Sequence, residues 1–390
     1  MFAAMTAAYA IYFASMVLVE EITHSSAQMG LMIFASTLPG LLFGLLAGVV
    51  VDRHERIGVL VTSNVLRTLV SLGFLAAVRF PKPPFLLPAV YLSNFVLSAL
   101  AQFVTAAEGA TIPRLVGSKQ LLAANSLFNL ALLASQGAGL VGLAPLLLKL
   151  GGPQAVASAA IVLDLAAVAL SASLPREEIR LQARERRTLA GLWADFKAGW
   201  CFIASDRPVS LATFQLVLAS SVSLVLSTLA PGLVARSLGL RVEDAAYMAV
   251  PVGAGLGLGL ALVGRRGDRR RKESWVNIGL LVLGGALALL PALRQLEGLW
   301  WLFFLLVAVG MGFGFSLIII PARTVLQERP PERMRGRVIA AQLTLSNAAN
   351  TLPLPLAGGL ADLIGIRRAL FLIALVVVGA GAASLYRTRG

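Results

Sequence analysis

The feature that most constrains this chain is a series of apolar runs, most of them about 20 residues long, with short charged segments between them. An α-helix of that length crosses the hydrocarbon core of a bilayer. Twelve such runs can be traced, at residues 1–19, 29–51, 57–78, 85–107, 121–148, 155–174, 208–230, 244–263, 274–293, 299–321, 338–360 and 366–386. The sequence therefore predicts an all-α membrane protein with twelve transmembrane helices. The first run begins at Met1, is short for a complete span and is expected to stay uncleaved.

Composition and charge agree with this class. Hydrophobic residues make up 58% of the 390 residues and charged residues only 13%, about half the charged share of a soluble protein. The net charge of +14 is a topology signal: with the N-terminus inside the cell, Lys and Arg favour the cytoplasmic loops by about three to one. We therefore expect a multi-pass membrane protein with both termini in the cytoplasm, and no nucleic-acid partner.

The longest polar stretch divides the chain into two halves. We expect an N-terminal six-helix bundle at 1–174, a cytoplasmic linker at 175–207 and a C-terminal six-helix bundle at 208–390. Apolar residues recur at helical spacing within the linker: Leu189, Leu192, Trp193, Phe196, Trp200 and Ile203. They predict an amphipathic helix on the inner membrane surface, in contact with lipids. The alternative, a soluble coil, would leave this stripe in water.

A charged turn joins the second and third runs and carries a recognisable motif. The segment Gly48-Val-Val-Val-Asp52-Arg53-His-Glu-Arg56 resembles the G-x-x-x-D-R-x-G-R signature of the major facilitator superfamily, with Glu55 in place of the second glycine. Gly48 is expected to let a neighbouring helix approach closely. The segments Arg335-Gly-Arg337-Val338 and Gly358-Gly-Leu-Ala-Asp362-x-x-Gly365 strengthen the resemblance. Together they are similar to bacterial exporters of the enterobactin and macrolide efflux type.

The resemblance implies a fold of two pseudo-symmetric bundles that transports by alternating access. It also implies a charge relay at the cytoplasmic face, in which Asp52 caps the helix that opens near Arg337. Arg56 would pair with Glu108 at the end of the fourth run, while Arg53 holds the loop inside. The alternative is that these charges only set topology.

Two opposite charges lie inside apolar runs. Arg67 falls near the middle of the third run and Asp164 near the middle of the sixth, both about 15 Å from the cytoplasmic boundary. Because an unpaired charge at that depth costs at least about 2.5 kcal/mol, we predict that the two form an ion pair. A brace for the bundle is the favoured role, and proton uptake by Asp164 is the alternative.

Uncharged polar residues on several runs are candidates for lining a central path. They are Tyr12, Asn94, Gln102, Asn125, Asn129, Gln136, Gln215, Gln342 and Asn347. Hydrogen bonding between helices is the alternative for each. A neutral, partly aromatic lining favours an amphiphilic small molecule over a sugar phosphate.

The sequence thus predicts a secondary active exporter of a small amphiphilic compound such as a drug or siderophore, acting as a monomer without cofactor or metal. Coupling to protons is left open, because the fifth run has Gly139-Leu140 where the antiporter signature has Gly-Pro. A translocator of lysophospholipid is the alternative function. A membrane enzyme is the remote one, because the only two histidines, His24 and His54, are expected on opposite sides of the bilayer.

Overall fold

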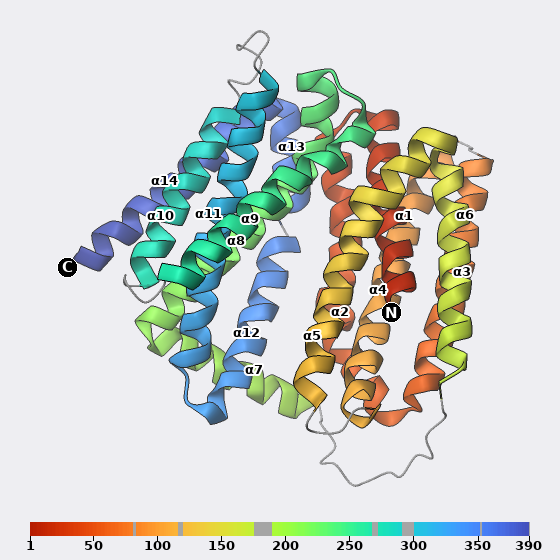
Figure 1. The fold of residues 1–390 in the computed structure, drawn as a ribbon, viewed down its shortest axis with the longest axis horizontal. Coiled ribbons are helices and arrows are strands. Elements are labelled where there is room, and N and C mark those ends of the chain that lie inside the picture. The colour runs from red at the N-terminus through yellow and green to blue at the C-terminus, as the bar shows by residue number, and fades with distance from the viewer. Residues whose placement is uncertain are drawn as a thin grey trace. The chain divides into compact units, whose positions relative to one another are not determined.

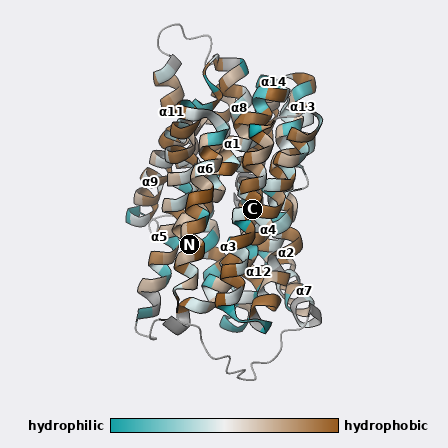
Figure 2. Ribbon diagram, turned by 90° about the vertical axis from the view of Figure 1, so that its right-hand side faces the viewer, coloured by the Kyte–Doolittle hydropathy of each residue, from teal (hydrophilic) through white to brown (hydrophobic). Residues whose placement is uncertain are grey.

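The computed structural model describes residues 1–80, 83–115, 120–174, 189–266, 272–290, 300–351 and 353–389 (Figure 1). Within these ranges all regular structure is helical, and hydrophobic residues predominate along the helices (Figure 2). The chain separates into two compact units. The first contains Met1–His24 and Leu31–Thr188, and the second contains Ser25–Gly30 and Leu189–Gly390.

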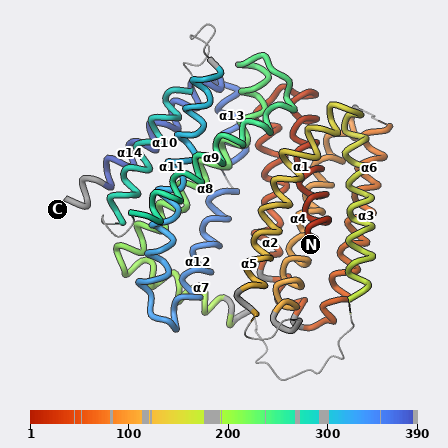
Figure 3. The backbone as a smooth tube through the Cα atoms, in the orientation of Figure 1, coloured from red at the N-terminus to blue at the C-terminus, as the bar shows by residue number. Residues whose placement is uncertain are grey.

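Among its described residues, the first unit holds six α-helices and one π-helical turn, apart from the start of α2, which belongs to the second unit. These elements are α1 (Phe2–Thr23), α2 (Ser26–Arg53), α3 (Arg56–Arg79), α4 (Pro83–Leu115), α5 (Leu121–Gly137), the π-helix η2 (Ala138–Leu143) and α6 (Ala144–Ala172). The helix α1 packs against α4, α5, α6 and η2, and α3 packs against α4 and α6 (Figure 3). Small side chains on α1 make this close packing possible: Ala4, Ala7, Ala10 and Ala14 are fully buried.

The second unit begins with the helix predicted in the linker. Its elements are α7 (Leu189–Ser205), α8 (Arg207–Gly232), the π-helix η3 (Leu233–Leu238), the 3₁₀-helix η4 (Val242–Met248), α9 (Ala249–Arg266), α10 (Lys272–Leu289), α11 (Trp300–Glu328), α12 (Glu332–Thr351), α13 (Leu354–Ile364) and α14 (Ile366–Arg389). The helix α11 is central: it packs against α8, α9 and α10. Glycines allow the closest approach, because a Cβ on Gly312 would overlap the carbonyl of Val252 on α9.

The helix α7 lies where the linker sequence predicts a helix, and its place on the inner membrane surface stays a prediction. Ile203 is buried in a core cluster with Val338 of α12, while Trp193 and Trp200 are 67% and 46% exposed. The helix packs closely on α12, since a Cβ on Gly199 would overlap the carbonyl of Arg337. The rest of the predicted linker, 175–188, lies outside the described residues, so the linker boundaries stay a prediction.

Ten of the described helical segments are long and apolar enough to cross a membrane. One of them, Ala123–Ala172, holds two predicted spans, because Gly151 and Gly152 leave helical geometry and Pro153 follows them. The predicted span 338–360 is interrupted between α12 and α13, where Pro353 precedes α13. Dividing Ala123–Ala172 gives eleven of the predicted spans, whereas 338–360 is not among the described segments that qualify, so the count of twelve stays a prediction. The fold is an all-α membrane fold.

Candidate functional site

The charged turn between α2 and α3 is as short as its sequence suggests. Only His54 and Glu55 separate the two helices, and His54 Nδ1 lies 2.9 Å from the carbonyl oxygen of Val50. The prediction for Gly48 is wrong, because among the described residues nothing lies within 4 Å of a Cβ built there. The side chain of Asp52 lies outside the described part of the structure, so its predicted capping role stays a prediction. Arg53 is exposed.

The cation of this turn reaches α4. Arg56 Nη1 donates to the carbonyl oxygen of Ala110 at 3.1 Å. Glu108, two residues earlier on α4, lies 3.2 Å from the Met1 ammonium through Oε1. Arg56, at the start of α3, thus contacts α4 two residues from Glu108, but the contacts described for the two side chains go to other groups. Their place in a charge relay stays a prediction.

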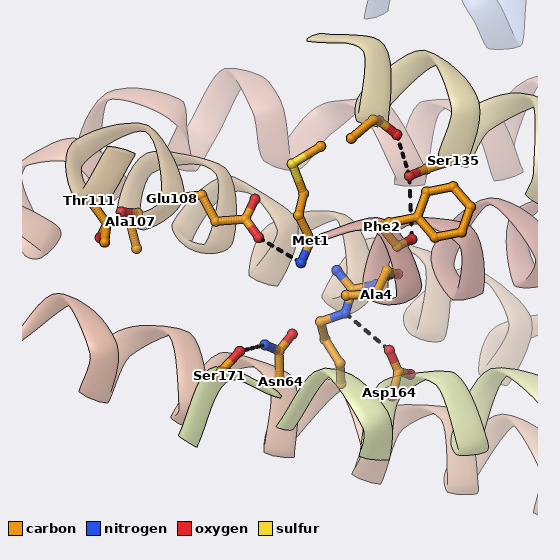
Figure 4. A network of polar contacts seen from close by, with 12 residues as sticks. Met1, Phe2, Ala4, Asn64, Ala107, Glu108, Thr111, Ser135, Asp164 and Ser171 are labelled. Atoms are coloured by element: carbon orange, nitrogen blue, oxygen red, sulfur yellow. Dashed lines mark hydrogen bonds and ion pairs between the residues drawn. The ribbon is translucent and has the colours of Figure 1, made fainter. Parts of the chain in front are cut away.

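Arg67 and Asp164 are brought together inside the first unit. Figure 4 shows Asp164 in this polar network, with Ala4 and Asn64 nearby. Arg67 Nε lies 3.5 Å from Asp164 Oδ1, and the two side chains are 0% and 1% exposed. Ser71 Oγ, one turn beyond Arg67 on α3, donates to Asp164 Oδ2 at 2.7 Å. Arg67 also donates to the carbonyl of Ala4. The pair therefore links α3, α6 and α1.

This network is only partly satisfied. Asn64 Nδ2 donates to Ser171 Oγ at 3.1 Å, which adds a second link between α3 and α6. Arg67 Nη1 and Asn64 Oδ1 have no hydrogen-bond partner among the described residues. An unmet polar atom in a buried site costs about 1–3 kcal/mol, so the charge of Arg67 depends strongly on Asp164 for compensation.

The polar candidates on α5 form an exposed stripe. Asn125, Asn129 and Gln136 are all exposed, and at 3.6 residues per turn they fall within about 40° of one another around the helix. Asn129 Nδ2 donates to the Asn125 carbonyl at 2.8 Å. Since polar groups are unfavourable against lipid, this face of α5 suits a water-accessible path.

Other candidates are engaged within their own unit. Asn94 is 3% exposed and donates to Ser15 Oγ at 2.7 Å, which joins α4 to α1. Gln215 is buried with Nε2 3.5 Å from Ser384 Oγ of α14. Gln342 is buried and donates to Ser346 Oγ at 2.7 Å on its own helix. For these three the geometry agrees with helix packing.

The remaining candidates are accessible to different degrees. Gln102 is half-buried, with its amide 3.9 Å from a Cβ built on Gly40 of α2. Tyr12 is half-buried and hydrogen-bonded to Ser36 of α2. Asn347 is exposed. Gln102 and Tyr12 thus lie beside α2.

Arg337 has a partner that the sequence did not suggest. Its Nε lies 2.7 Å from Asp195 Oδ1 of α7, and the two side chains are about half exposed. The contact fastens the surface helix α7 to the start of α12. Arg337 therefore also holds the helix α7 against α12. Its predicted role in the cytoplasmic charge relay stays a prediction.

One polar cluster was missed by sequence reasoning. Asp362, near the end of α13, accepts hydrogen bonds from Ser25 and from the first backbone N–H groups of α2, and it pairs with Arg236. Burial alone would raise the pKa of the Asp362 carboxyl. The hydrogen bonds from Ser25, Ala27 and Ser26 outweigh burial, so the net pKa lies below its usual value. The only sequence signal was the motif that contains Asp362.

Nothing in the described part of the chain gathers three or more His, Cys, Asp or Glu side chains in a geometry that could hold a metal ion. The charged residues instead form ion pairs and helix-end contacts. The long apolar helices of the described residues place this chain in the class of multi-pass helical membrane proteins.

Comparison with known proteins gives the family. The family model "Major Facilitator Superfamily" matches residues 1–353, so this chain belongs to that superfamily. The multidrug efflux pump Tap of Mycolicibacterium fortuitum is 31% identical over 143 residues, which cover 36% of this chain and 33% of the pump. The match thus spans about a third of the length of this curated relative.

Solved structures show the same fold. A bacterial homologue of the iron transporter ferroportin superposes with a TM-score of 0.76 at 16% identity, covering 98% of this chain and 96% of that one. The nucleoside transporter NupG superposes with a TM-score of 0.74 at 12% identity, covering 100% and 98%. The D-xylose–proton symporter gives 0.70 at 14% identity, covering 98% and 95%. The prediction of a major facilitator fold is confirmed, and the chain is a transporter.

Proposed function

We propose that this transporter is a secondary active exporter of a small amphiphilic molecule and that it works by alternating access. The observation that carries the proposal is the exposed stripe of Asn125, Asn129 and Gln136 on α5, which is polar but uncharged. Such a surface offers hydrogen bonds without a charge to select a phosphate or a carboxylate. The 31% identity to a multidrug efflux pump over 143 residues supports export as the direction.

The cytoplasmic charges are proposed to form the inner gate. Arg56 supports this role through its bond to the Ala110 carbonyl, because the bond ties the α2–α3 turn to the end of α4, close to Glu108. Asp52, Arg53 and Arg337 complete the proposed set on the resemblance of their motifs. The buried pair of Arg67 and Asp164 is proposed to brace the first unit, which lets that unit move as one body.

Proton antiport is the proposed energy source. Within this proposal the protein resides in a bacterial inner membrane as a monomer among lipids, with both termini in the cytoplasm. The sided distribution of Lys and Arg along the sequence supports that topology. Reporter fusions at each terminus and light scattering of the purified protein would test topology and oligomeric state.

Transport in proteoliposomes with an imposed pH gradient tests the function. Three cargoes would be compared: a lipophilic cationic dye, a siderophore and a lysophospholipid. We expect uphill movement of the dye or the siderophore that collapses when the pH gradient is removed. Flux of the lysophospholipid alone would favour lipid translocation. If a folded preparation moves none of the three in response to the gradient, proton-coupled export is wrong.

A further inference from the structure

The carboxylate of Asp362 caps the first turn of a helix that lies far away in the sequence. It accepts hydrogen bonds from Ser25 Oγ at 2.6 Å, from the Ser26 N–H at 2.8 Å and from the Ala27 N–H at 2.9 Å. Backbone N–H groups at a helix start have no partner within the helix, and an acid at that end is favoured by the helix dipole. The start of α2 therefore receives its cap from α13.

A cation completes the contact. Arg236, in η3 after α8, has Nη1 3.5 Å from Asp362 Oδ1, and its Nη2 donates to Ser26 Oγ at 2.6 Å. The side chains of Arg236 and Asp362 are 29% and 27% exposed. One guanidinium thus bridges the acid that caps α2 and a side chain within the first turn of α2.

Two glycines allow the backbones to meet at this point. A Cβ on Gly358 of α13 would overlap the carbonyl of Ser26, and a Cβ on Gly30 of α2 would lie 2.5 Å from the carbonyl oxygen of Leu354. Gly358 is one helical turn before Asp362, so one face of α13 offers both the space and the cap. The same spacing, glycine followed four residues later by aspartate, occurs in Gly48-x-x-x-Asp52.

The contact assigns a short piece of chain to an unexpected unit. Residues Ser25–Gly30 belong to the second unit, whereas Met1–His24 before them and Leu31–Thr188 after them belong to the first. The sequence predicts that Thr23–Ser26 forms an outer loop between the first two spans. A segment of the first half of the chain is therefore held by the second unit at the predicted outer end of α2.

We propose that Asp362 and Arg236 form an outer latch, and that Asp362 is a gating residue whose contacts with Ser25, Ser26 and Ala27 must open during transport. The inference rests on the proposed function, because a gate has a role only in alternating access. Partial exposure suits a contact that opens and closes: exposed ion pairs are individually weak, whereas breaking a buried one is costly. Because these bonds are weak, breaking or forming them is enough to shift the transporter between its outward-closed and outward-open populations.

The test measures how accessible the α5 stripe is from outside the cell, and it does not depend on export of a cargo. Cys201 is the only cysteine, so Cys201→Ser gives a cysteine-free background into which Asn129→Cys places a reporter on the α5 stripe. A membrane-impermeant maleimide added outside intact cells then measures how often that stripe is open outward. We expect Asp362→Asn to increase the labelling rate at least threefold, because the outer latch no longer favours the closed outer end.

A matched control separates the outer latch from a general loss of ion pairs. Glu243 pairs with Arg241 at 3.0 Å in the same unit, and Glu243→Gln is expected to leave labelling unchanged. Arg236→Gln should raise labelling less than Asp362→Asn, and the two together should match Asp362→Asn alone, since both changes open one contact. Asp362→Glu should restore part of the slow labelling.

Labelling that stays the same in both Asp362→Asn and Arg236→Gln, with unchanged melting temperatures, would overturn the outer latch. So would equal acceleration by Glu243→Gln. If Asp362→Asn does not fold, the labelling rate of Arg236→Gln decides whether the outer latch exists. Because the labelling needs no cargo, accelerated labelling in a protein that exports none of the tested compounds would overturn the proposed exporter and leave the outer latch standing.

Discussion

Arg67 Nε lies 3.5 Å from Asp164 Oδ1, and this buried ion pair joins α3 to α6, two helices that are long and apolar enough to cross a membrane. Taking two charges out of water is expensive, and only their mutual attraction and their hydrogen bonds offset that cost. Ser71 donates a hydrogen bond to Asp164, and the Ala4 carbonyl accepts one from Arg67. The pair is therefore expected to respond strongly when one member is removed.

Replacing one partner of this pair should destabilise the protein far more than replacing a residue of an exposed contact between the same two helices. Arg67→Ala or Asp164→Ala should each cost about 3–5 kcal/mol, since the remaining charge is left buried. The double variant should cost less than the sum of the single ones. Thermal unfolding in detergent would measure these losses.

The control is the contact between Arg79 and Gln154, which also joins α3 to α6, at 3.2 Å and in an exposed position. Arg79→Ala should change stability by less than about 1 kcal/mol. If the losses from Arg67→Ala and Asp164→Ala simply add in the double variant, the two residues do not stabilise the unit as a pair.

A second prediction concerns the π-helical turn after α5. A Cβ on Gly139 would lie 2.7 Å from the Thr6 carbonyl oxygen and 2.7 Å from Tyr9 Cβ, both on α1. Gly139→Ala should therefore destabilise the protein by about 1–3 kcal/mol through overpacking. At Gly137 nothing described lies within 4 Å of such a Cβ, so Gly137→Ala should be neutral or stabilise slightly. Equal melting temperatures for the two variants would contradict this packing.

Much of the fold could be predicted because apolar run length reports directly on membrane spans. The break between spans five and six was also predicted, because the runs end at 148 and resume at 155, and Gly151 and Gly152 leave helical geometry between them. The π-helical turn at Ala138–Leu143 and the interruption before Leu354 were not. Both irregularities depend on how a helix packs against neighbouring helices. The sequence of that helix alone does not reveal this packing.

Contacts in the site could be predicted where an unpaired charge would be too costly to leave without a partner. Arg67 and Asp164 could be paired because their depths match and a lone charge in hydrocarbon is costly. Arg337 could not be matched to Asp195, nor Asp362 to Ser25, because charges at helix ends can reach many partners in water. Those contacts depend on the rotation and register of helices, which appear only in the folded chain.

Stability should depend on pH through Asp362 in a defined direction. Its folded pKa is lowered, so the carboxylate contributes stability that is present above the ordinary aspartate pKa of about 4 and is lost as pH falls through the lower folded value. The difference in melting temperature between the natural chain and Asp362→Asn should therefore be constant from about pH 5 to 8 and shrink below about pH 4. A difference that changes between pH 6 and 8 would show that another group controls this contact.

The α5 stripe should govern which cargo is bound rather than whether the protein folds. Asn129→Ala removes an exposed amide whose described bond is to the Asn125 carbonyl of its own helix, so the melting temperature should change little. If the stripe lines the path, KM for a transported dye should rise several-fold, about 1 kcal/mol of lost binding for each fivefold change. Leu127→Ala is the control, since Leu127 is 66% exposed and lies on the opposite side of α5. A similar rise in KM from Leu127→Ala would mean that the polar face has no special part in cargo binding.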